Sequence, residues 1–381
     1  AKATLPDEKD FSNFPEFHIF SLPAESHWQN LIITNKDVGA SIQSAMRGIE
    51  SANPDKLSGI FGDVQWTNKD RLPDDLLRDL ISHFSSKTLD NGNAPFDLLG
   101  NAYEYMIRQF ADDGGHTAAE FYTHRTVVKL MTAITKPSHG DSIYDPTCGS
   151  GGMLLNSIKH VKEKNEDYRT VSLFGQEMNI ITSSIARMNM LLHGVEDFDI
   201  VQGDTLEFPK HLNSGRLQQY NVVLANPPYS VNKWNRTKWK SDPFGRNIWG
   251  TPPQSFADYA FIQHIHSCMR ESDGRAAILL PNGILFRDAE ESIRKKMIQS
   301  GCIKAVIGLG ENLFYNSPME ACILILDNRA APHNEILFID GHKEIVHERG
   351  SSFLSERNIE RISNAYMQPR TASVPSRIVP L

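Results

Sequence analysis

A short polar segment that follows an apolar run contains residue types suited to the methylation of an amino group. Residues 220–225 are mostly apolar and predict a buried strand, and Asn226, Pro227, Pro228 and Tyr229 follow it directly. An amine on an aromatic ring is a poor nucleophile because its lone pair is delocalised into the ring. Two acceptors directed at the amine hydrogens would localise that lone pair. The side-chain carbonyl of Asn226 and the backbone carbonyl of Pro227 are candidates for these acceptors.

The same segment indicates how an aromatic base would be held. The two prolines restrict the turn, and Tyr229 offers an aromatic face for a base taken out of its stack, as enzymes that act on a base within a duplex require. An ordinary turn that closes a strand would have the same tetrapeptide. The interpretation therefore depends on what the rest of the chain contains.

A glycine-rich turn, residues 145–152, lies earlier in the chain where a predicted strand meets a predicted helix. Its small residues let the backbone approach a ligand closely, and the helix N-terminus favours a negative group such as a carboxylate. A dinucleotide would also fit a glycine-rich turn, but the spacing here is Gly-x-Gly-Gly rather than Gly-x-Gly-x-x-Gly. Asp145, which opens the turn, could hold a cationic amine. The small residues are Gly149, Ser150, Gly151 and Gly152.

The next two predicted strands also end at acidic residues. Glu177 follows the second strand, where a carboxylate can accept hydrogen bonds from both ribose hydroxyls, and Asp204 follows the third, where it suits an adenine amino group. Each carboxylate alone could equally be a helix cap or a surface charge. Together with Asp145, they place acidic residues at three successive strand ends. This pattern predicts a pocket for an amino acid attached to a nucleoside, which is S-adenosylmethionine.

Length, charge and cysteine content limit the class of protein. The chain has 381 residues, 40% of them hydrophobic, which suffices for two domains or for one large domain with an appendage. The formal charge of -7 argues against nucleic-acid binding through a broad basic face. The four cysteines form no CxxC pair, so we expect neither a metal site nor disulfides, and a reducing cytoplasm fits. The sequence predicts no signal peptide and no membrane span.

The elements that must position these residues fall into three regions. Residues 1–113 predict a helical N-terminal domain, and a polar, glycine-rich break ends it. Residues 114–345 predict the catalytic domain. Residues 346–381 predict a C-terminal helix and a tail, of which residues 368–381 are expected to be extended rather than folded. The helices predicted in the first region are 37–50, 74–84 and 96–111.

Strands and helices alternate in the catalytic domain. This alternation predicts an α/β fold with a mainly parallel sheet, helices on both faces and ligands at the carboxyl ends of the strands. Two later apolar runs, residues 321–326 and 336–339, are expected to pair antiparallel with each other at one edge. The predicted strands are 142–144, 171–175, 198–202, 221–225, 276–280 and 303–307, and the predicted helices are 152–163, 179–193, 255–270 and 288–299.

Basic and aromatic residues interleave in residues 233–249. Directly after the candidate catalytic segment, such a loop would contact phosphates and stack on bases, and we expect it to be mobile without DNA. A surface loop whose tryptophans pack against the core would have the same composition. Lys233 and Trp234 are the candidate substrate-binding residues of this loop.

The helix after this loop contains three further residues of interest. Phe261 could form a wall of the base site, although aromatic residues on such a helix more often belong to the core. His264 and His266 have no third ligand in the sequence, which argues against a metal site. Further along, Arg287 and Asp288 predict only the start of a helix.

The order of these motifs resembles that of the amino-methylating DNA methyltransferases. Specifically, residues 145–152, Glu177, Asp204 and residues 226–229 resemble the modification (M) subunit of a type I restriction-modification system, which is an N6-adenine DNA methyltransferase. The family usually has a proline after the threonine of an upstream segment, whereas this chain has His124 there. The likeness extends to Glu120, Phe121, Tyr122 and Thr123 upstream, and to residues 258–261, 280–283 and 312–315 downstream.

The resemblance implies a fold, a reaction and partners. The fold would be that of the S-adenosylmethionine-dependent methyltransferases, a seven-stranded sheet with its last strand antiparallel, preceded by a helical domain. The reaction would be methyl transfer to N6 of adenine in duplex DNA. A separate specificity subunit would choose the target and bind two copies of this chain, and whether a restriction (nuclease) subunit joins them is left open. The upstream segment and Arg125 would contact the cofactor.

Two alternatives to this function stay open. One is a methyltransferase that acts on RNA or on a protein glutamine amide, because the same two acceptors serve any planar amine. The other is a catalytically silent, DNA-binding scaffold subunit that keeps the cofactor fold. The interleaved basic loop argues against the first, and the intact Asn226 and Tyr229 argue against the second.

Overall fold

The computed structural model describes most of the chain, which forms two compact units. It describes residues 20–86, 96–113, 123–313, 320–329, 331–348 and 351–381. The units are residues 1–98 and 99–381, and helix α6 (Phe96–Asp113) contains the division. The boundary expected at residue 113 stays a prediction. Within the described part, no helix is both long and apolar enough to cross a membrane.

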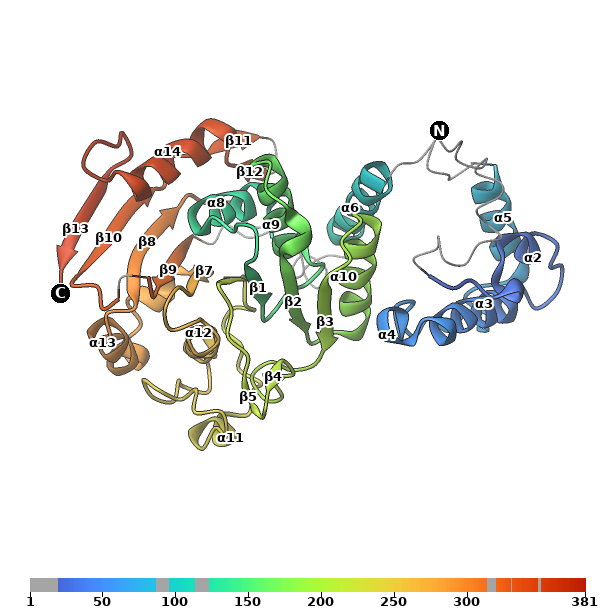
Figure 1. Ribbon diagram of the computed structural model, residues 1–381, viewed down its shortest axis with the longest axis horizontal. Helices are drawn as coiled ribbons and strands as arrows, with labels where there is room; N and C mark the ends of the chain where they lie inside the picture. Colours follow the sequence, from blue (N-terminus) through green and yellow to red (C-terminus); the bar gives the residue numbers. More distant parts are fainter. Residues whose placement is uncertain (1–19, 87–95, 114–122, 314–319, 330, 349–350) are drawn as a thin grey trace, which may run out of the picture. The chain divides into compact units, whose positions relative to one another are not determined.

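The first unit is helical, as expected (Figure 1). Its small core brings Ile42 of one helix together with Leu77 and Ile81 of another. The same two helices are joined by a cap, because the Asp74 carboxylate accepts a hydrogen bond from the Val38 N–H at 3.0 Å. The helical elements described are η2 (Ala24–Ser26), α2 (Trp28–Ile32), α3 (Val38–Ala52), α4 (Pro54–Leu57) and α5 (Asp74–Ser85).

The second unit is built on one large sheet. Within the described residues it has nine strands in the order β13-β10-β8-β9-β7-β6-β1-β2-β3. From β3 to β7 the neighbours are parallel, and β9 lies antiparallel between β7 and β8. The seven strands from β3 to β8 are those expected, and β10 and β13 extend the sheet beyond β8. The strands are β1 (Ser142–Asp145), β2 (Ser172–Glu177), β3 (Phe198–Gln202), β6 (Val222–Ala225), β7 (Arg275–Pro281), β8 (Ile303–Leu309), β9 (Ala321–Asp327), β10 (Glu335–Gly341) and β13 (Ser376–Pro380).

Helices cover both faces of this sheet (Figure 1). On one face α8, α9, α10 and α14 contribute to the core, and α12 and α13 do so on the other. Short 3-10 helices and a short α11 lie in the connections. The elements are α8 (Arg125–Thr135), α9 (Gly152–Glu163), η3 (Tyr168–Thr170), α10 (Ile180–Leu192), α11 (Arg236–Lys240), α12 (Asp258–Ser267), η4 (Asn282–Leu285), η5 (Asp288–Glu290), α13 (Glu291–Gln299) and α14 (Glu356–Met367).

Alternating side chains divide the core into two layers. Ile143 and Leu224 pack with α8 and α9, whereas their strand neighbours Tyr144 and Val223 pack with α12. Successive residues of a strand point to opposite faces, so the short strands β1 and β6 support both layers. Strands that are buried on both faces have continuous apolar sequences, which is why residues 220–225 predicted a strand.

The expected pairing of the two late apolar runs is wrong. Strand β9 pairs with β7 and β8, while β10 pairs parallel with β8 and antiparallel with β13. Nearness in sequence favoured a hairpin, but β9 buries all seven of its residues in the middle of the sheet. The tail, expected to be extended rather than folded, is extended but contributes β13 to the sheet edge. Two small antiparallel ribbons complete the unit: β4 (Leu212–Asn213) with β5 (Arg216–Leu217), and β11 (Val346–Glu348) with β12 (Ser351–Phe353).

Candidate active site

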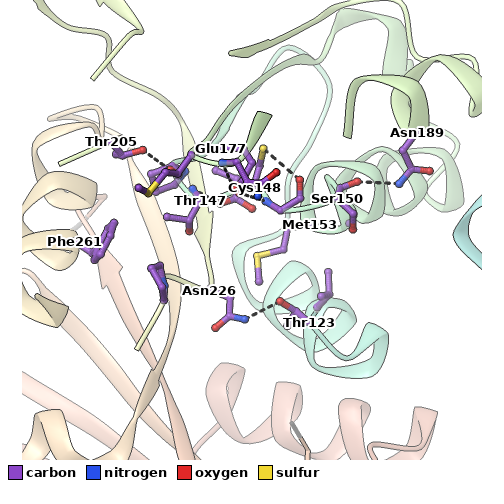
Figure 2. Close-up of a pocket in the computed structure, with 18 of the residues that line it drawn as sticks. Thr123, Thr147, Cys148, Ser150, Met153, Glu177, Asn189, Thr205, Asn226 and Phe261 are labelled. Atoms are coloured by element: carbon purple, nitrogen blue, oxygen red, sulfur yellow. Dashed lines mark hydrogen bonds between the residues drawn. The ribbon is translucent and has the colours of Figure 1, made fainter. Parts of the chain in front are cut away.

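A cavity of about 570 Å³ lies at the carboxyl ends of β1, β2, β3 and β6 (Figure 2). Parallel strands bring their carboxyl ends to one edge of a sheet, so residues far apart in the sequence meet there. The residues predicted from sequence that line it are Thr123, Arg125, Asp145, Gly149, Ser150, Gly152, Glu177, Asp204, Asn226, Pro228, Lys233, Trp234 and Phe261.

Other predicted site residues do not line the cavity or lie outside the described residues. Gly151 and Pro227 do not line the cavity, and Tyr229 contacts a lining residue, Asn226, through its hydroxyl group. The predicted cofactor residues Glu120, Phe121 and Tyr122 lie outside the described residues, so their role stays a prediction.

The glycine-rich turn between β1 and α9 has the backbone conformation that its sequence predicts. Gly149 and Gly151 have φ angles of 53° and 81°, a left-handed region that favours glycine. A side chain at Gly151 would also clash, because an added Cβ would lie 2.5 Å from Cε of Met190. The turn is fixed to its neighbours by the Cys148 N–H, which donates to the Gln176 carbonyl of β2 at 3.0 Å.

Two carboxylates at this end of the cavity are buried and held by backbone donors. Asp145 is 2% exposed and accepts from the Thr147 N–H at 3.0 Å, and burial raises its pKa to about 8. Glu177 is 6% exposed and accepts from the N–H groups of Gly149 at 3.1 Å and Asn179 at 2.8 Å. Burial also raises the pKa of Glu177. Such a pair favours a ligand with a cationic group and hydrogen-bond donors.

The third predicted carboxylate lies in a turn that is joined to the glycine-rich turn. One oxygen of Asp204 accepts from the N–H groups of Leu206 at 2.9 Å and Glu207 at 3.1 Å. The intervening Thr205 donates its hydroxyl hydrogen to the Pro146 carbonyl at 2.5 Å. The carboxyl ends of β1 and β3 are therefore connected directly across the cavity floor.

The Asn226 amide is hydrogen-bonded at both its nitrogen and its oxygen, and Figure 2 shows its contact with Thr123. Its Nδ2 donates to the Thr123 hydroxyl at 2.9 Å, and its Oδ1 accepts from the Tyr229 hydroxyl at 2.5 Å. The sequence predicted Thr123 as a cofactor residue and Tyr229 as a stacking face, but it did not predict that both contact Asn226. Both polar atoms of the Asn226 amide are therefore hydrogen-bonded within the chain.

A buried group of charges behind the catalytic turn was missed at the sequence level. Ser230, which follows Tyr229, has a φ angle of 52°, and its N–H donates to Asp258 at 3.1 Å. Asp258 also accepts from Arg287, which binds Glu290 as well. Assigning Arg287 only to a helix start was therefore incomplete, because its side chain balances these buried carboxylates. The acidic residue of the 258–261 motif was the available signal.

The interleaved basic and aromatic loop is divided between the cavity and the core. Lys233 and Trp234 line the cavity, and their role in substrate binding stays a prediction. Trp239 and Trp249 are 2% and 5% exposed, and Arg246 is 1% exposed, so these three side chains are not available to DNA. The alternative of tryptophans packed against the core is confirmed for these two. This burial argues against the mobility expected for the loop.

The two histidines of α12 have structural surroundings. Burial lowers the pKa of His264 well below its usual value, and the nearby Arg246 guanidinium lowers it further. His264 contacts Arg246 through Nδ1 and the Tyr144 hydroxyl through Nε2, each at 3.2 Å. His266 lies against the Trp249 ring, with a centroid distance of 5.0 Å. Phe261, on the same helix, is 6% exposed and forms part of the cavity wall.

The strand order and the position of the cavity define the class of protein. The chain has the fold of the class I S-adenosylmethionine-dependent methyltransferases. A solved structure of a Listeria monocytogenes protein assigned to that class has the same fold, with a TM-score of 0.55 at 17% identity, over 83% of this chain and 91% of that one.

Sequence comparison then gives the family. The N-6 DNA Methylase family matches residues 94–379, and the HsdM N-terminal domain family matches residues 3–84. The chain therefore belongs to the N-6 DNA methylase family, and the recognition made from its motifs is confirmed.

Its relatives are methylase subunits of type I restriction enzymes. A solved methyltransferase subunit of a type I restriction-modification system from Streptococcus thermophilus is 30% identical, with a TM-score of 0.84, over 98% of this chain and 80% of that one. The MpnII methylase subunit of Mycoplasma pneumoniae is 32% identical over 89% of this chain, and the HindI methylase subunit of Haemophilus influenzae is 29% identical over 89%. The chain spans 65% of the length of the first of these two and 76% of the second.

Proposed function

We propose that this chain transfers a methyl group from S-adenosylmethionine to N6 of adenine in duplex DNA, as the modification subunit of a type I restriction-modification system. The observation that supports this most is the position of Asn226. Its amide lines the same cavity as the carboxylates of Asp145, Glu177 and Asp204. A group that can orient a planar amine therefore lies beside a site for an amino acid attached to a nucleoside.

The residues present fit the cofactor. When bound, S-adenosylmethionine supplies an activated methyl group on a sulfonium. Asp145 is suited to its cationic amine, Glu177 to the ribose hydroxyls and Asp204 to the adenine amino group. Gly149 lines the cavity without a side chain, so the backbone of the turn can approach a ligand closely there.

The catalytic turn orients the amine of the target base. Asn226 Oδ1 and the Pro227 carbonyl accept the two amine hydrogens, which localises the nitrogen lone pair for in-line attack. These hydrogen bonds strengthen as positive charge develops on the nitrogen, so they stabilise the transition state more than the bound base. Tyr229 gives up its contact with Asn226 and offers its ring to the base. The excess proton of the methylated amine passes to water.

The outer rim of the cavity is suited to the extruded nucleotide. Lys233 and Trp234 line the cavity from the loop after the catalytic turn, and Phe261 lines it from α12. The lysine supplies a positive charge for a phosphate, and the aromatic rings supply apolar walls for a base. These roles rest on position in the cavity and on side-chain chemistry.

A separate specificity subunit would choose the DNA target. Sequence-specific modules bury roughly 600–1,000 Å² against DNA, and a net charge of -7 disfavours unaided binding of this chain. The family resemblance implies two copies of this chain with one specificity subunit, and whether a restriction (nuclease) subunit joins them is left open.

The test is to measure methylation and cofactor binding with the purified chain. We expect calorimetry to show that the chain binds S-adenosylmethionine alone, since the proposed contacts all lie within it. Sequence-specific methylation of defined duplexes is expected only when the specificity subunit from the same operon is added. Robust sequence-specific methylation by the chain alone would contradict the proposed division of labour.

The same assay separates the alternatives. Methyl transfer to RNA or to a protein glutamine, but not to duplex DNA with the specificity subunit present, would favour the first alternative. DNA binding by the complex without transfer to any substrate would favour the silent scaffold.

A further inference from the structure

Arg246 is a fully buried cation in the loop that follows the catalytic turn. It is 1% exposed, and its charge is balanced by Asp242, whose Oδ1 accepts from Nη2 at 2.6 Å. Nε donates to the same carboxylate at 3.1 Å, and two further hydrogen bonds of the guanidinium go to carbonyl groups outside the loop. Nη1 donates to the Thr205 carbonyl at 2.9 Å, and Nη2 donates to the Leu206 carbonyl at 2.7 Å. A planar guanidinium can satisfy all these acceptors at once, which a lysine ammonium cannot do.

The carbonyl groups that Arg246 binds belong to the turn that lines the cofactor end of the cavity. Asp204, Thr205 and Leu206 all line the cavity. In this turn the N–H of Leu206 donates to Asp204, and the Thr205 hydroxyl donates to Pro146. Arg246 therefore holds the outer side of a turn whose inner side presents the Asp204 carboxylate.

A second branch leads from Arg246 to the end of β1. The guanidinium contacts Nδ1 of His264, whose pKa is lowered by burial, so the imidazole is neutral and accepts the hydrogen bond. Nε2 of the same ring then donates to the Tyr144 hydroxyl at 3.2 Å. Tyr144 directly precedes Asp145, the carboxylate predicted to hold the cofactor amine. One arginine thus connects the ends of β1 and β3.

The loop that contains Arg246 is attached to the same turn at further points. Lys238 Nζ donates to the Glu207 carbonyl at 3.1 Å and lies 4.1 Å from the centre of the Phe208 ring. Asn235 Nδ2 donates to the Glu207 carboxylate at 3.2 Å. The 233–249 loop, which follows the catalytic turn, and the turn that begins at Asp204 are therefore packed together.

We propose that Arg246 is a positioning residue that sets the geometry of the 204–206 turn and thereby the affinity for S-adenosylmethionine. This inference rests on the proposed function, because it assigns the turn to that cofactor. Arg246 does not touch the ligand site itself and acts through the two carbonyl groups and His264. Arg246 belongs to the loop that also contains Lys233 and Trp234. A change at Arg246 therefore affects the binding of the cofactor and the binding of DNA together.

A second buried arginine provides a matched control. Arg275 is 7% exposed and pairs with Asp141, and it donates to the carbonyl groups of Thr135 at 2.5 Å and Lys136 at 2.9 Å. It resembles Arg246 in burial, in its carboxylate partner and in its bonds to two successive carbonyl groups. None of these partners lines the described cavity. Replacing Arg275 therefore shows how the loss of a buried arginine affects stability when the cavity lining is not involved.

The experiment compares Arg246→Met with Arg275→Met in the full chain. Both substitutions are expected to lower the melting temperature, because each leaves buried carbonyl and carboxylate groups without a donor. Calorimetric titration with S-adenosylmethionine, at a temperature where both variants are folded, is expected to show affinity weakened roughly tenfold or more for Arg246→Met. For Arg275→Met the affinity should stay within about twofold of the parent.

The lysine variants keep the test usable if a methionine variant does not fold. Arg246→Lys retains the charge but cannot hold both carbonyl groups, so cofactor affinity should fall between those of the parent and the methionine variant, while Arg275→Lys leaves it unchanged. Equal affinity losses at the two arginines, or none at Arg246, would overturn the inference. A parent chain that binds no S-adenosylmethionine would instead overturn the proposed function.

Discussion

The cofactor-facing and base-facing ends of the cavity hold their polar groups in different ways. At the first end, the carboxylates of Asp145 and Glu177 accept from the backbone N–H groups of Thr147, Gly149 and Asn179. These donors are fixed by turns whose shape the backbone determines. The backbone therefore holds the carboxylates in place, and we expect the proposed cofactor to bind with little rearrangement.

At the base-facing end, the polar side chains form hydrogen bonds with one another. Asn226 is bound by the hydroxyl groups of Thr123 and Tyr229, both on side chains that can rotate. Asn226 Oδ1 is thus paired with the Tyr229 hydroxyl. The comparison shows that the chain holds the carboxylates through its backbone, whereas it holds the Asn226 amide through side chains. The Tyr229 hydroxyl keeps this partly buried acceptor paired.

The largest expected effect is the loss of kcat when Asn226, at the base-facing end, is replaced. Asn226→Ala removes the acceptor that acts on the amine in the transition state, so kcat should fall by about 10³-fold. Cofactor affinity should change little, because the cofactor carboxylates keep their backbone donors. Single-turnover methylation of a defined duplex by the assembled complex, with calorimetry of the cofactor, provides the two readouts. Transfer at the parental rate would refute the proposed mechanism.

The next largest effect is the loss of cofactor affinity when Glu177, at the cofactor-facing end, is replaced. Glu177→Ala removes a buried charged acceptor, which should weaken S-adenosylmethionine binding by about 1.5–3 kcal/mol. Glu344→Ala is the control, because Glu344 is also buried and bound, to Asn358 and Arg361, but does not line the cavity. Calorimetry of both variants tests the assignment. Parental affinity in the Glu177 variant would show that the ribose contact is wrongly placed.

The pH dependence of cofactor binding gives an intermediate effect. Burial raises the pKa of Asp145 to about 8, so at neutral pH the ligand-free carboxyl group is mostly protonated. A cationic amine requires the carboxylate, so binding releases a proton and affinity should rise with pH between pH 6 and 7.5, by up to about tenfold per unit. Titrations in buffers of different ionisation enthalpy measure the released proton. Asp145→Asn should abolish the release; proton uptake by the parent would contradict the assignment.

The smallest effect is expected from Tyr229→Phe. The variant loses the hydrogen bond to Asn226 but keeps the ring, so the free energy of unfolding should fall by only about 0.5–1.5 kcal/mol. Methylation should stay within a few-fold of the parent, whereas Tyr229→Ala, which removes the stacking face, should be much slower. Denaturant unfolding and the duplex assay measure the two quantities. Equal loss of transfer in both variants would mean that the hydroxyl group, not the ring, is required.

The sequence was sufficient to predict four of the polar residues that converge at the cavity. Asp145, Glu177, Asp204 and Asn226 each follow an apolar run, and parallel strands bring such positions to one edge. Alternation of strands and helices predicted the layers for the same reason. These predictions rest on local patterns and on one topological rule.

Other features depend on contacts that sequence patterns do not specify. The bond between Asn226 and Thr123 joins residues 103 positions apart, and the pairing of β9 with β7 and β8 required a choice among strands that are equally apolar. The loop with Arg246 has the composition of a solvated, DNA-binding segment, yet its interior residues are fixed by a neighbouring turn. Burial of a charged residue cannot be predicted until its partners are known.

The insertion of β9 between β7 and β8 also determines the order in which the sheet can form. Strands β7 and β8 are made first along the chain, but they do not pair with each other, and each binds β9 instead. On a ribosome, the edge of β7 that faces away from β6 therefore stays open until residues 321–327 have emerged. Because long-range pairing of this kind slows folding, the joining of β7 to β8 through β9 is a late event in the synthesis of the chain.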